Sequence, residues 1–392
     1  LSQSQNELSE KEVIEKFRDT EIFKITSKEF SAHLNKIEEP TFEGVWQSGI
    51  YKIGIIKDES STEEKYIGFI IEGDGVYWKK NQVKLKIYKS ERKYISDFYS
   101  KDHSIIRFEN IDLLGSNFLS LGSVNLKRLE SKFTINSEIE NYFNSLSSNN
   151  ASIKEHSKET MLLRIPSFAM TNKMQIDSIL KVNHNEIVHH KNLIIDLRNN
   201  VGGSGGSDQI YQNIIPYVYT NPIKIVDVEF LSTPINNQRM ESLIAHPSMP
   251  EASKEWARKG LEKLNNNPGK FVHLNDSIVT TLKLDDVYEY PKNVAILING
   301  KNASTVEQFL IDVKQSKKVK LFGTSTMGAI DIAGLNTVLF PCEDLRLIYG
   351  LSRSLRMPNY AVDGRGVQPD YFIHESIPQH KWITYVGKIL NQ

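Results

Sequence analysis

One segment constrains the fold of this chain more than any other, because it predicts a buried strand, a tight turn and a helix with a serine between them. Residues 293–298 are mostly apolar, the Asn-Gly pair at 299–300 predicts a turn, and Ser304 follows. The apolar residues after Ser304 recur at helical spacing and predict one buried face; they are Val306, Phe309, Leu310 and Val313. A serine at this junction is placed to act as a nucleophile, with free N–H groups nearby to stabilise an oxyanion. Helix capping is the alternative, since serine is a common N-cap residue.

A second strand-and-turn segment lies about a hundred residues upstream. Residues 191–198 predict a short buried strand with a polar end, and residues 199–206 form a turn with four glycines. Glycine tolerates positive φ and lets a backbone N–H approach a ligand closely. Phosphate binding is the alternative for such a turn, but the lysine of a P-loop and the Gly-x-Gly-x-x-Gly spacing are both missing. The turn is therefore better suited to hold a substrate oxygen than a nucleotide.

The composition is that of an ordinary soluble globular protein. The 392 residues are enough for two domains, and 39% of them are hydrophobic and 24% charged. Lys plus Arg and Asp plus Glu both number 48, so the formal net charge is zero and we expect no nucleic-acid partner. No apolar run approaches the length needed to span a membrane.

The cysteine and histidine content predicts no disulfide, no metal site and no cofactor. Cys342 is the only cysteine, and we expect it to be buried and unreactive. The histidine spacing contains no His-Glu-x-x-His or comparable ligand set. The chain starts at Leu1 with a polar run after it, which is typical of a processed exported protein. A periplasmic or cell-surface location is the resulting expectation.

Taken together, the two segments resemble peptidase family S41, the serine peptidases that include the C-terminal processing proteases and the tricorn protease. The resemblance covers residues 159 to the C-terminus. It rests on four pieces in a specific order and spacing, namely residues 161–168, residues 193–200, the serine turn and residues 363–370. The resemblance implies a crotonase-like α/β catalytic domain and a peptide or protein substrate. The alternation of strands and helices in this part of the chain agrees with that fold.

Carried over residue by residue, the resemblance makes Ser304 the nucleophile and gives Thr305 one oxyanion N–H. The other N–H comes from the third glycine of the family's Asn-Gly-Gly-Gly turn, which is Gly203 if residues 200–203 are the matching tetrad. Val201 stands where the family has its first glycine, a departure that alters the turn without removing the donor.

The base that activates the serine separates two branches of the family. Processing proteases use a lysine about 25 positions after the serine, where this chain has Ala329, so a Ser-Lys dyad of that kind is excluded. The tricorn-like branch uses a histidine from the N-terminal part and an acidic residue near the C-terminus. His103, about 200 residues before Ser304, and Asp363 match those places, and imidazole is a suitable base near pH 7. The alternatives are a surface histidine and an ordinary turn aspartate, and His190 is a reserve base.

The sequence also predicts the domain organisation. We expect an N-terminal helical segment at residues 1–39, an antiparallel β domain at 40–130, a linker at 131–158 and the catalytic domain at 159–392. An insertion at about 233–288 is predicted to form a lid or substrate wall. The alternative function is a catalytically silent relative that binds peptides or small apolar ligands on the same fold. The sequence gives no oligomeric state.

Overall fold

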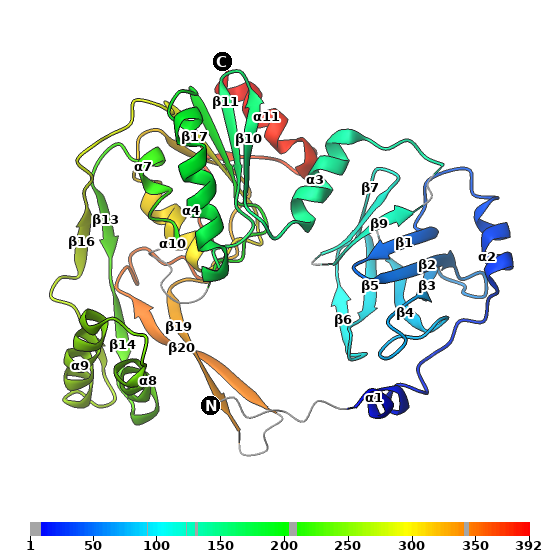
Figure 1. The fold of residues 1–392 in the computed structure, drawn as a ribbon, viewed down its shortest axis with the longest axis horizontal. Coiled ribbons are helices and arrows are strands. Elements are labelled where there is room, and N and C mark those ends of the chain that lie inside the picture. Colours follow the sequence, from blue (N-terminus) through cyan, green and yellow to red (C-terminus); the bar gives the residue numbers. More distant parts are fainter. Residues whose placement is uncertain (1–8, 92, 123, 130–131, 204–209, 341–344) are drawn as a thin grey trace. The chain divides into compact units, whose positions relative to one another are not determined.

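The chain forms two compact units, Leu1–Ser147 and Ser148–Gln392, each with its own hydrophobic core (Figure 1). The computed structural model describes residues 9–91, 93–122, 124–129, 132–203, 210–340 and 345–392. Cys342 and the second half of the glycine-rich turn lie outside the described residues. Among the described helices, none is both long and apolar enough to cross a membrane.

The first unit is built on a nine-stranded sheet in which every strand pair is antiparallel. The strand order is β6-β5-β4-β3-β2-β1-β9-β8-β7. Its elements are α1 (Glu10–Lys16), α2 (Ser27–Leu34), β1 (Gly44–Ser48), β2 (Tyr51–Lys57), β3 (Lys65–Glu72), β4 (Val83–Ser90), β5 (Lys93–Tyr99), β6 (Ile105–Phe108), β7 (Asp112–Leu114), β8 (Phe118–Leu121), β9 (Val124–Leu129) and α3 (Ser137–Ser147). Fully buried side chains such as Trp46, Ile53 and Leu85 form the core. The antiparallel sheet expected in this part of the chain is therefore present.

The range predicted as a linker contains regular structure. Residues 137–147 form α3, whose Ile139 and Phe143 pack against Phe118 of the first unit. Residues 152–157 form a strand of the second unit. Ile139 and Phe143 are four residues apart and so share a helix face, a pattern that the serine-rich stretch after them obscures in the sequence.

The second unit is an α/β structure around a six-stranded sheet of order β10-β11-β12-β17-β18-β21. All neighbours in this sheet are parallel except β10 and β11. The sheet strands are β10 (Ser152–Ser157), β11 (Thr160–Arg164), β12 (Asn192–Asp196), β17 (Asn293–Ile298), β18 (Val319–Gly323) and β21 (Tyr371–Phe372). The other elements are η1 (Met170–Asn172), α4 (Lys173–Val182), α5 (His184–Ile187), α7 (Ile215–Val218), β13 (Ile223–Val226), β14 (Val228–Leu231), α8 (Pro234–Ala245), α9 (Glu251–Asn265), β15 (Phe271–His273), β16 (Val279–Leu282), α10 (Thr305–Val313), β19 (Ile332–Leu339), β20 (Arg346–Ser354), η2 (Gln379–Lys381) and α11 (Trp382–Leu390).

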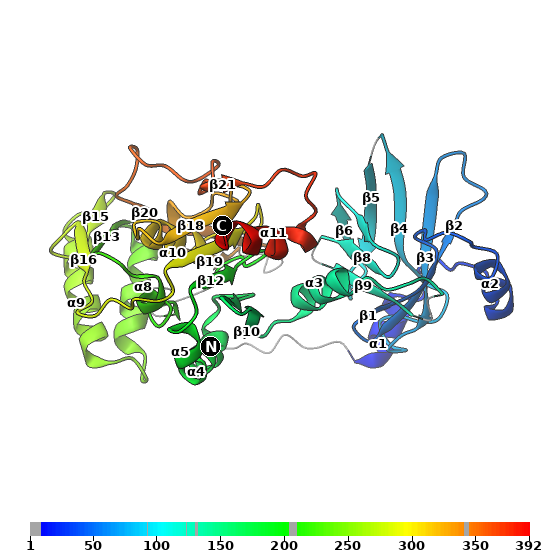
Figure 2. The same ribbon diagram turned by 90° about the horizontal axis from the view of Figure 1, so that it is seen from above.

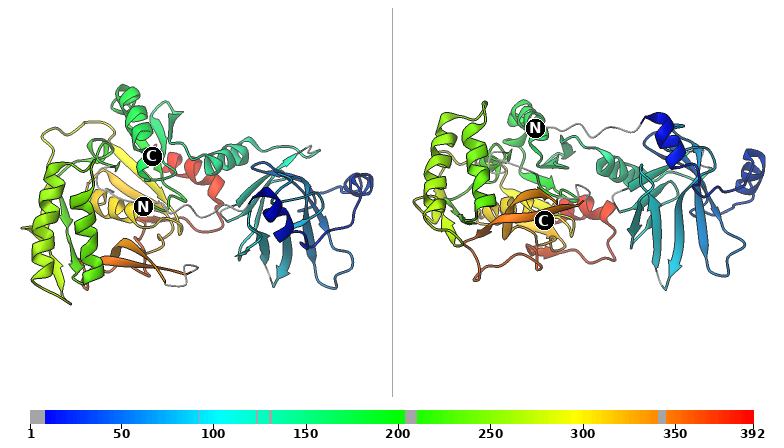
Figure 3. Two further views of the ribbon diagram at one scale, coloured as in Figure 1. Left: turned by 60° about the horizontal axis from the view of Figure 1, so that its bottom comes forward. Right: turned by 90° about the horizontal axis from the view of Figure 1, so that it is seen from below.

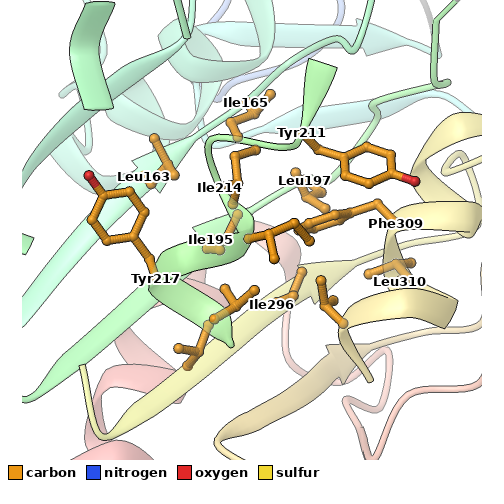
Figure 4. Close-up of a cluster of buried hydrophobic side chains, with 14 of the residues drawn as sticks. Leu163, Ile165, Ile195, Leu197, Tyr211, Ile214, Tyr217, Ile296, Phe309 and Leu310 are labelled. Carbon is orange, nitrogen blue, oxygen red and sulfur yellow. The ribbon is translucent and has the colours of Figure 1, made fainter. Parts of the chain in front are cut away.

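Successive residues of the central strands pack into two different cores, one on each face of the sheet. On one face, residues such as Ile195 and Ile296 meet Phe309 and Leu310 of α10 (Figure 4). On the other face, their neighbours in the strands meet α11, which lies along the sheet (Figure 2). Burial on both faces explains why these strands are continuous apolar runs rather than alternating ones.

The range predicted as a lid contains α8, α9, β15 and β16, and the two helices lie side by side (Figure 3). A second, four-stranded sheet of order β15-β14-β20-β19 adjoins them. Asn236 of α8 accepts a hydrogen bond from Tyr349 of β20 at 2.8 Å, so the insertion is attached to the β19–β20 hairpin. Its function as a lid remains a prediction.

Candidate active site

The serine turn and the glycine turn meet because they follow neighbouring strands. Strands β12 and β17 are parallel and paired from Asn192 with Asn293 to Asp196 with Leu297. The loops that leave their carboxyl ends therefore emerge at the same edge of the sheet, where ligand sites of open α/β sheets lie. Ser304 is the residue immediately before α10 in one of these loops.

The backbone of Ser304 is strained. Its φ is 58° and its ψ is −123°, values of the first central position of a type II′ turn, which normally requires glycine. An ordinary N-cap residue has extended φ and ψ, so capping does not account for this conformation. Strained backbone of this kind concentrates at functional sites, and a sharp strand-to-helix turn that exposes a serine is the arrangement of a nucleophile elbow.

The glycine turn packs directly against Ser304. A Cβ atom on Gly202 would lie 2.7 Å from the carbonyl oxygen of Ala303 and 3.0 Å from Ser304 Cβ. A Cβ atom on Gly203 would lie 1.8 Å from the carbonyl oxygen of Phe168. Neither position has room for a side chain, so both glycines are required for this close approach.

The two residues predicted to supply the oxyanion hole are in contact. The Thr305 hydroxyl donates to the carbonyl oxygen of Gly203 at 3.1 Å. Thr305 is the first residue of α10, so its N–H has no acceptor within the helix. In the described part of the chain, the N–H groups of Gly203 and Thr305 have no hydrogen-bond acceptor. Both are therefore available to a substrate oxygen.

Four asparagines join the two turns, and we call them the asparagine cluster: Asn199, Asn200, Asn299 and Asn302. The amide of Asn302 donates to the carbonyl oxygens of Leu197 at 2.6 Å and Asn200 at 2.9 Å. The amide of Asn299 donates to Asn199 Oδ1 at 2.8 Å, and the Asn199 N–H donates back to Asn299 Oδ1 at 3.1 Å. Asn200 accepts from Gly202 N–H at 2.9 Å. These bonds fix the position of the serine turn relative to the glycine turn.

Glu307 holds the serine turn to the loop after β18. Its carboxylate is completely buried and accepts hydrogen bonds from the N–H groups of Ser304 at 3.1 Å, Gly328 at 2.7 Å and Ala329 at 2.8 Å. It also accepts one from the Thr326 hydroxyl at 2.5 Å. All four partners are donors, which matches an ionised carboxylate.

Position 329 contributes only its backbone to the site. The carbonyl oxygen of Ala329 accepts from the N–H of Ser304 at 3.2 Å, and the residue itself is exposed. The position at which the resemblance places the lysine of processing proteases therefore lies beside Ser304, and alanine there offers no side chain that accepts a proton.

Asp363 lies in the same unit as Ser304 and organises the loop that follows Ala329. Its carboxylate accepts from the N–H groups of Ile330 at 2.6 Å, Asp331 at 2.7 Å and Ile332 at 3.2 Å. The third bond is the only one on Oδ2 among the described residues, which leaves that oxygen able to accept another donor. The turn role and the catalytic role of Asp363 are thus compatible with each other.

Asp331 in turn holds the segment that carries Asp363. Its buried carboxylate accepts from the N–H groups of Val362 at 2.5 Å and Asp363 at 2.9 Å and forms an ion pair with Arg356 at 3.3 Å. The two aspartates therefore bind each other's main-chain segments, and the loop is held from both sides.

A second buried carboxylate lies inside α10. Asp312 accepts from the Tyr211 hydroxyl at 3.0 Å and from the Gln308 amide at 2.8 Å. Burial raises the pKa of Asp312 to about 6, because these neutral donors only partly replace water. The helix that starts directly after Ser304 thus contains a carboxyl group that titrates near neutral pH.

His103 lies in the first unit, between β5 and β6, with a φ of 63°. Its ring is stacked between Phe17 and Trp78, with centroid distances of 4.0 Å and 3.8 Å. Nε2 donates to the carbonyl oxygen of Tyr77 at 2.7 Å, and Nδ1 lies 3.0 Å from the Thr20 hydroxyl. Burial lowers the pKa of His103 below its ordinary value. All of these contacts lie within the first unit and occupy both ring nitrogens, so the predicted catalytic role requires His103 to exchange them.

The reserve base, His190, is at the wrong end of the sheet. It precedes the first residue of β12, whereas Ser304 follows the carboxyl end of the parallel strand β17. A strand of five residues spans about 16 Å, so His190 is beyond hydrogen-bonding reach of Ser304. Its Nδ1 bonds the carbonyl oxygen of Glu186 at 2.6 Å, which is a local structural contact.

The residues that form this site lie within the part of the chain that matches a known protein family. The model of peptidase family S41 matches residues 159–373, more than half of the chain, and this range includes both turns, Glu307 and Asp363. The chain belongs to peptidase family S41. The predicted family and the prediction of a serine peptidase are confirmed, and the substrate class is that of a peptidase.

Several solved structures are similar to this S41 chain. A lipoprotein from Streptococcus agalactiae is 17% identical, with 63% of this chain and 72% of that chain covered and a TM-score of 0.36. Mature CPAF complexed with lactacystin is 13% identical over 90% of this chain and 84% of that chain, with a TM-score of 0.47. The photosystem II D1 C-terminal processing protease is 11% identical over 93% and 80%, with a TM-score of 0.40. A comparison with curated protein sequences gives no match.

Three features of the S41 site could not be found from the sequence by motif. They are the asparagine cluster, the four donors around Glu307 and the Asp331–Arg356 pair. The only signal was the richness of the two turns in asparagine, which is also common in ordinary turns. In the described residues no group of three His, Cys, Asp or Glu side chains is arranged to hold a metal ion.

Proposed function

We propose that this S41 peptidase cleaves peptide bonds through an acyl-enzyme formed on Ser304. The observation that carries the proposal is the strained backbone of Ser304 beside the N–H groups of Gly203 and Thr305, which have no acceptor among the described residues. The parallel sheet with helices on both faces also supports the crotonase-like assignment of the catalytic domain.

In the proposed reaction, Ser304 Oγ attacks the carbonyl carbon of the scissile peptide bond while a base takes the hydroxyl proton. The oxyanion that forms is stabilised by the N–H groups of Gly203 and Thr305. The base returns the proton to the leaving amine, and a water molecule then hydrolyses the ester by the same sequence. Removal of one oxyanion donor typically lowers the rate by about 10²- to 10³-fold.

We propose His103 as the base and Asp363 as the acidic residue that orients it. The resemblance places the base in the N-terminal part of the chain, and the histidines of the first unit are His33 and His103. His33 Nε2 lies 2.6 Å from Glu43 Oε1, so His103 is the better candidate. Oδ2 of Asp363 has capacity for an imidazole N–H beside its bond from Ile332. Because the pKa of His103 is lowered, a His103 base would remain active at pH values below the usual range of histidine.

The proposal is tested by labelling with a fluorophosphonate probe and measuring the intact mass. We expect one adduct on the natural chain and none on Ser304→Ala. A Ser242→Ala variant on the exposed side of α8 should be labelled normally, because that hydroxyl bonds only within its helix.

Two substitutions of His103 separate catalysis from structure. His103→Phe preserves the stack with Phe17 and Trp78 but removes both ring nitrogens, whereas His103→Ala removes the stack as well. Loss of labelling in both variants is expected for a base. Normal labelling of His103→Phe would assign the residue a structural role. No adduct on the folded natural chain over a broad pH range would favour the alternative function, a catalytically silent relative that binds peptides. Two observations support that alternative: both ring nitrogens of His103 are occupied, and residue 329 is an alanine.

A further inference from the structure

Strand β19 is an edge strand without the usual protection of an edge. It is the last strand in the order β15-β14-β20-β19 and, among the described strands, pairs with β20 alone. On its outer edge, Arg239 donates to the carbonyl oxygen of Gly334 at 3.4 Å. Its eight residues, Ile332–Leu339, include no charged side chain and no proline. Edge strands normally carry lysine, proline or a bulge that prevents another chain from pairing with them. A long uncharged edge is therefore a surface on which another strand can add.

The outer half of the β19–β20 hairpin has exposed apolar side chains. Strand β14 pairs with β20 only at Ser352 to Ser354, so the part of the hairpin beyond this point is a two-stranded ribbon. Large apolar residues on this ribbon are exposed to solvent: Leu335, Leu339, Phe340, Leu345, Leu347 and Ile348. An isolated two-stranded ribbon is only marginally stable in water, and exposed apolar patches of this kind mark sites of interaction.

The position of β19 in the chain connects it with Ser304. The carbonyl oxygen of Ala329 accepts the N–H of Ser304, and β19 begins three residues later at Ile332. Three residues span at most about 11 Å. The first residue of β19 is also held by Asp363, at 3.2 Å from its N–H. The edge therefore starts near Ser304 and leads away from it over about 25 Å. Asp363 and Arg239 bond the N–H of Ile332 and the carbonyl oxygen of Gly334, so the part that can receive a strand begins after Gly334.

We propose that β19 binds the peptide substrate as an added β-strand and selects extended, apolar segments without positive charge. This inference rests on the proposed function of Ser304. Main-chain hydrogen bonds to an edge strand provide affinity without regard to sequence, and alternate side chains provide selectivity. β19 itself carries no charge, and the guanidinium of Arg239 lies at Gly334, so a cationic peptide segment would lose water there without gaining a partner. The continuity of β19 with the site favours substrate over a second copy of the chain as the occupant.

The test uses Leu335→Lys, which places a charge in the middle of the free edge. Leu335 is 72% exposed, so the substitution should leave the fold intact. Val182→Lys is the matched control, because Val182 is 78% exposed at the end of α4 and far from β19 in the sequence. Two quantities are measured for each variant: the rate of fluorophosphonate labelling and kcat/KM for fluorescein-labelled casein, an unfolded protein probe.

We expect Leu335→Lys to lower kcat/KM for casein by about 10- to 100-fold, the factor that corresponds to burial of one leucine side chain. Labelling by the small probe should be unchanged, as should both quantities in Val182→Lys. Hydrogen exchange of β19 amides in Ser304→Ala should slow when casein is added. These three results together support the inference.

Other outcomes overturn it. Equal kcat/KM in Leu335→Lys and Val182→Lys, or no slowing of exchange in β19, would show that substrate does not occupy this edge. If the natural chain reacts with the probe but, without the probe, does not cleave casein, that result would count against an edge that accepts unfolded segments. A change of molar mass in light scattering without a change in casein cleavage would assign β19 to contact with a second copy. Absence of labelling in the natural chain would instead refute the proposed function, and the inference with it.

Discussion

Replacement of Ser304 by glycine should stabilise the second unit relative to replacement by alanine. Both variants remove the hydroxyl, but only glycine removes the Cβ atom that makes φ 58° and ψ −123° unfavourable. A residue held in such a sparsely populated region costs about 1–3 kcal/mol. Glycine also makes the unfolded chain more flexible, which offsets about 0.4–1 kcal/mol of that gain. The Ser304→Gly variant should therefore exceed Ser304→Ala by roughly 0.5–2 kcal/mol in the free energy of unfolding.

Native-state hydrogen exchange of the amides of β17 measures this difference within the unit concerned. Tryptophan fluorescence would mix the two units, because Trp46 and Trp78 lie in the first and Trp256 and Trp382 in the second. The expected difference slows exchange in β17 by about 2- to 30-fold in the glycine variant. Amides of β4 in the first unit are the internal control and should not change. Equal exchange in both variants, or slower exchange in Ser304→Ala, would mean that position 304 is not strained and that the serine is an ordinary helix cap.

Three further predictions concern the residues around the nucleophile. Gly203→Ala should lower the free energy of unfolding by at least about 1–3 kcal/mol and abolish labelling, because its Cβ would lie 1.8 Å from a carbonyl oxygen. Gly300→Ala is the control in chemical denaturation, because its Cβ would meet no atom closer than 3.8 Å and Gly300 has no positive φ. Glu307→Gln should lower stability by about 3 kcal/mol or more and reduce labelling, because the carboxylate accepts four hydrogen bonds and an amide nitrogen cannot accept any; a variant as stable as the natural chain would contradict this. Asp312 has a pKa of about 6, above its unfolded value, so its stabilising contribution is present below about pH 4 and is lost as the pH rises through 6. Asp312→Asn should remove that loss and have a free energy of unfolding higher than the natural chain by up to about 3 kcal/mol at pH 8. Urea denaturation of both proteins at pH 4, 6 and 8 measures this. A difference in the free energy of unfolding that does not vary with pH would refute it.

The strands and turns of the catalytic region could be predicted because their signals are local. Residues 191–198 and 293–298 are apolar runs of strand length, and the glycines and Asn-Gly pair after them end the strands. The proximity of Gly203 to Ser304 could be expected only through the family resemblance, since about a hundred residues separate them. Parallel pairing of β12 with β17 is the physical reason for their proximity, and no local pattern encodes which strands pair.

The use of each polar side chain could not be predicted, because hydrogen-bond partners are set by tertiary contacts. Asp363 was a candidate catalytic acid, and the structure shows it binding three backbone N–H groups. His103 was selected by its spacing from Ser304, but spacing along the chain carries no information about the aromatic rings that enclose it. The sequence around Ala329 likewise gives no indication that its carbonyl oxygen accepts the N–H of Ser304.

The asparagine cluster has a consequence for how the activity of this peptidase depends on pH. The serine turn and the glycine turn are joined by carboxamide groups, which neither gain nor lose a proton in the range where proteins remain folded. The hydrogen bonds of the asparagine cluster therefore hold Ser304 at the same distance from Gly203 and Thr305 at every pH at which the protein is folded. An acidic limb in the rate profile therefore does not report a loosening of this joint; it reports the base or Asp312, whose pKa is about 6, and the Asp312→Asn variant separates the two.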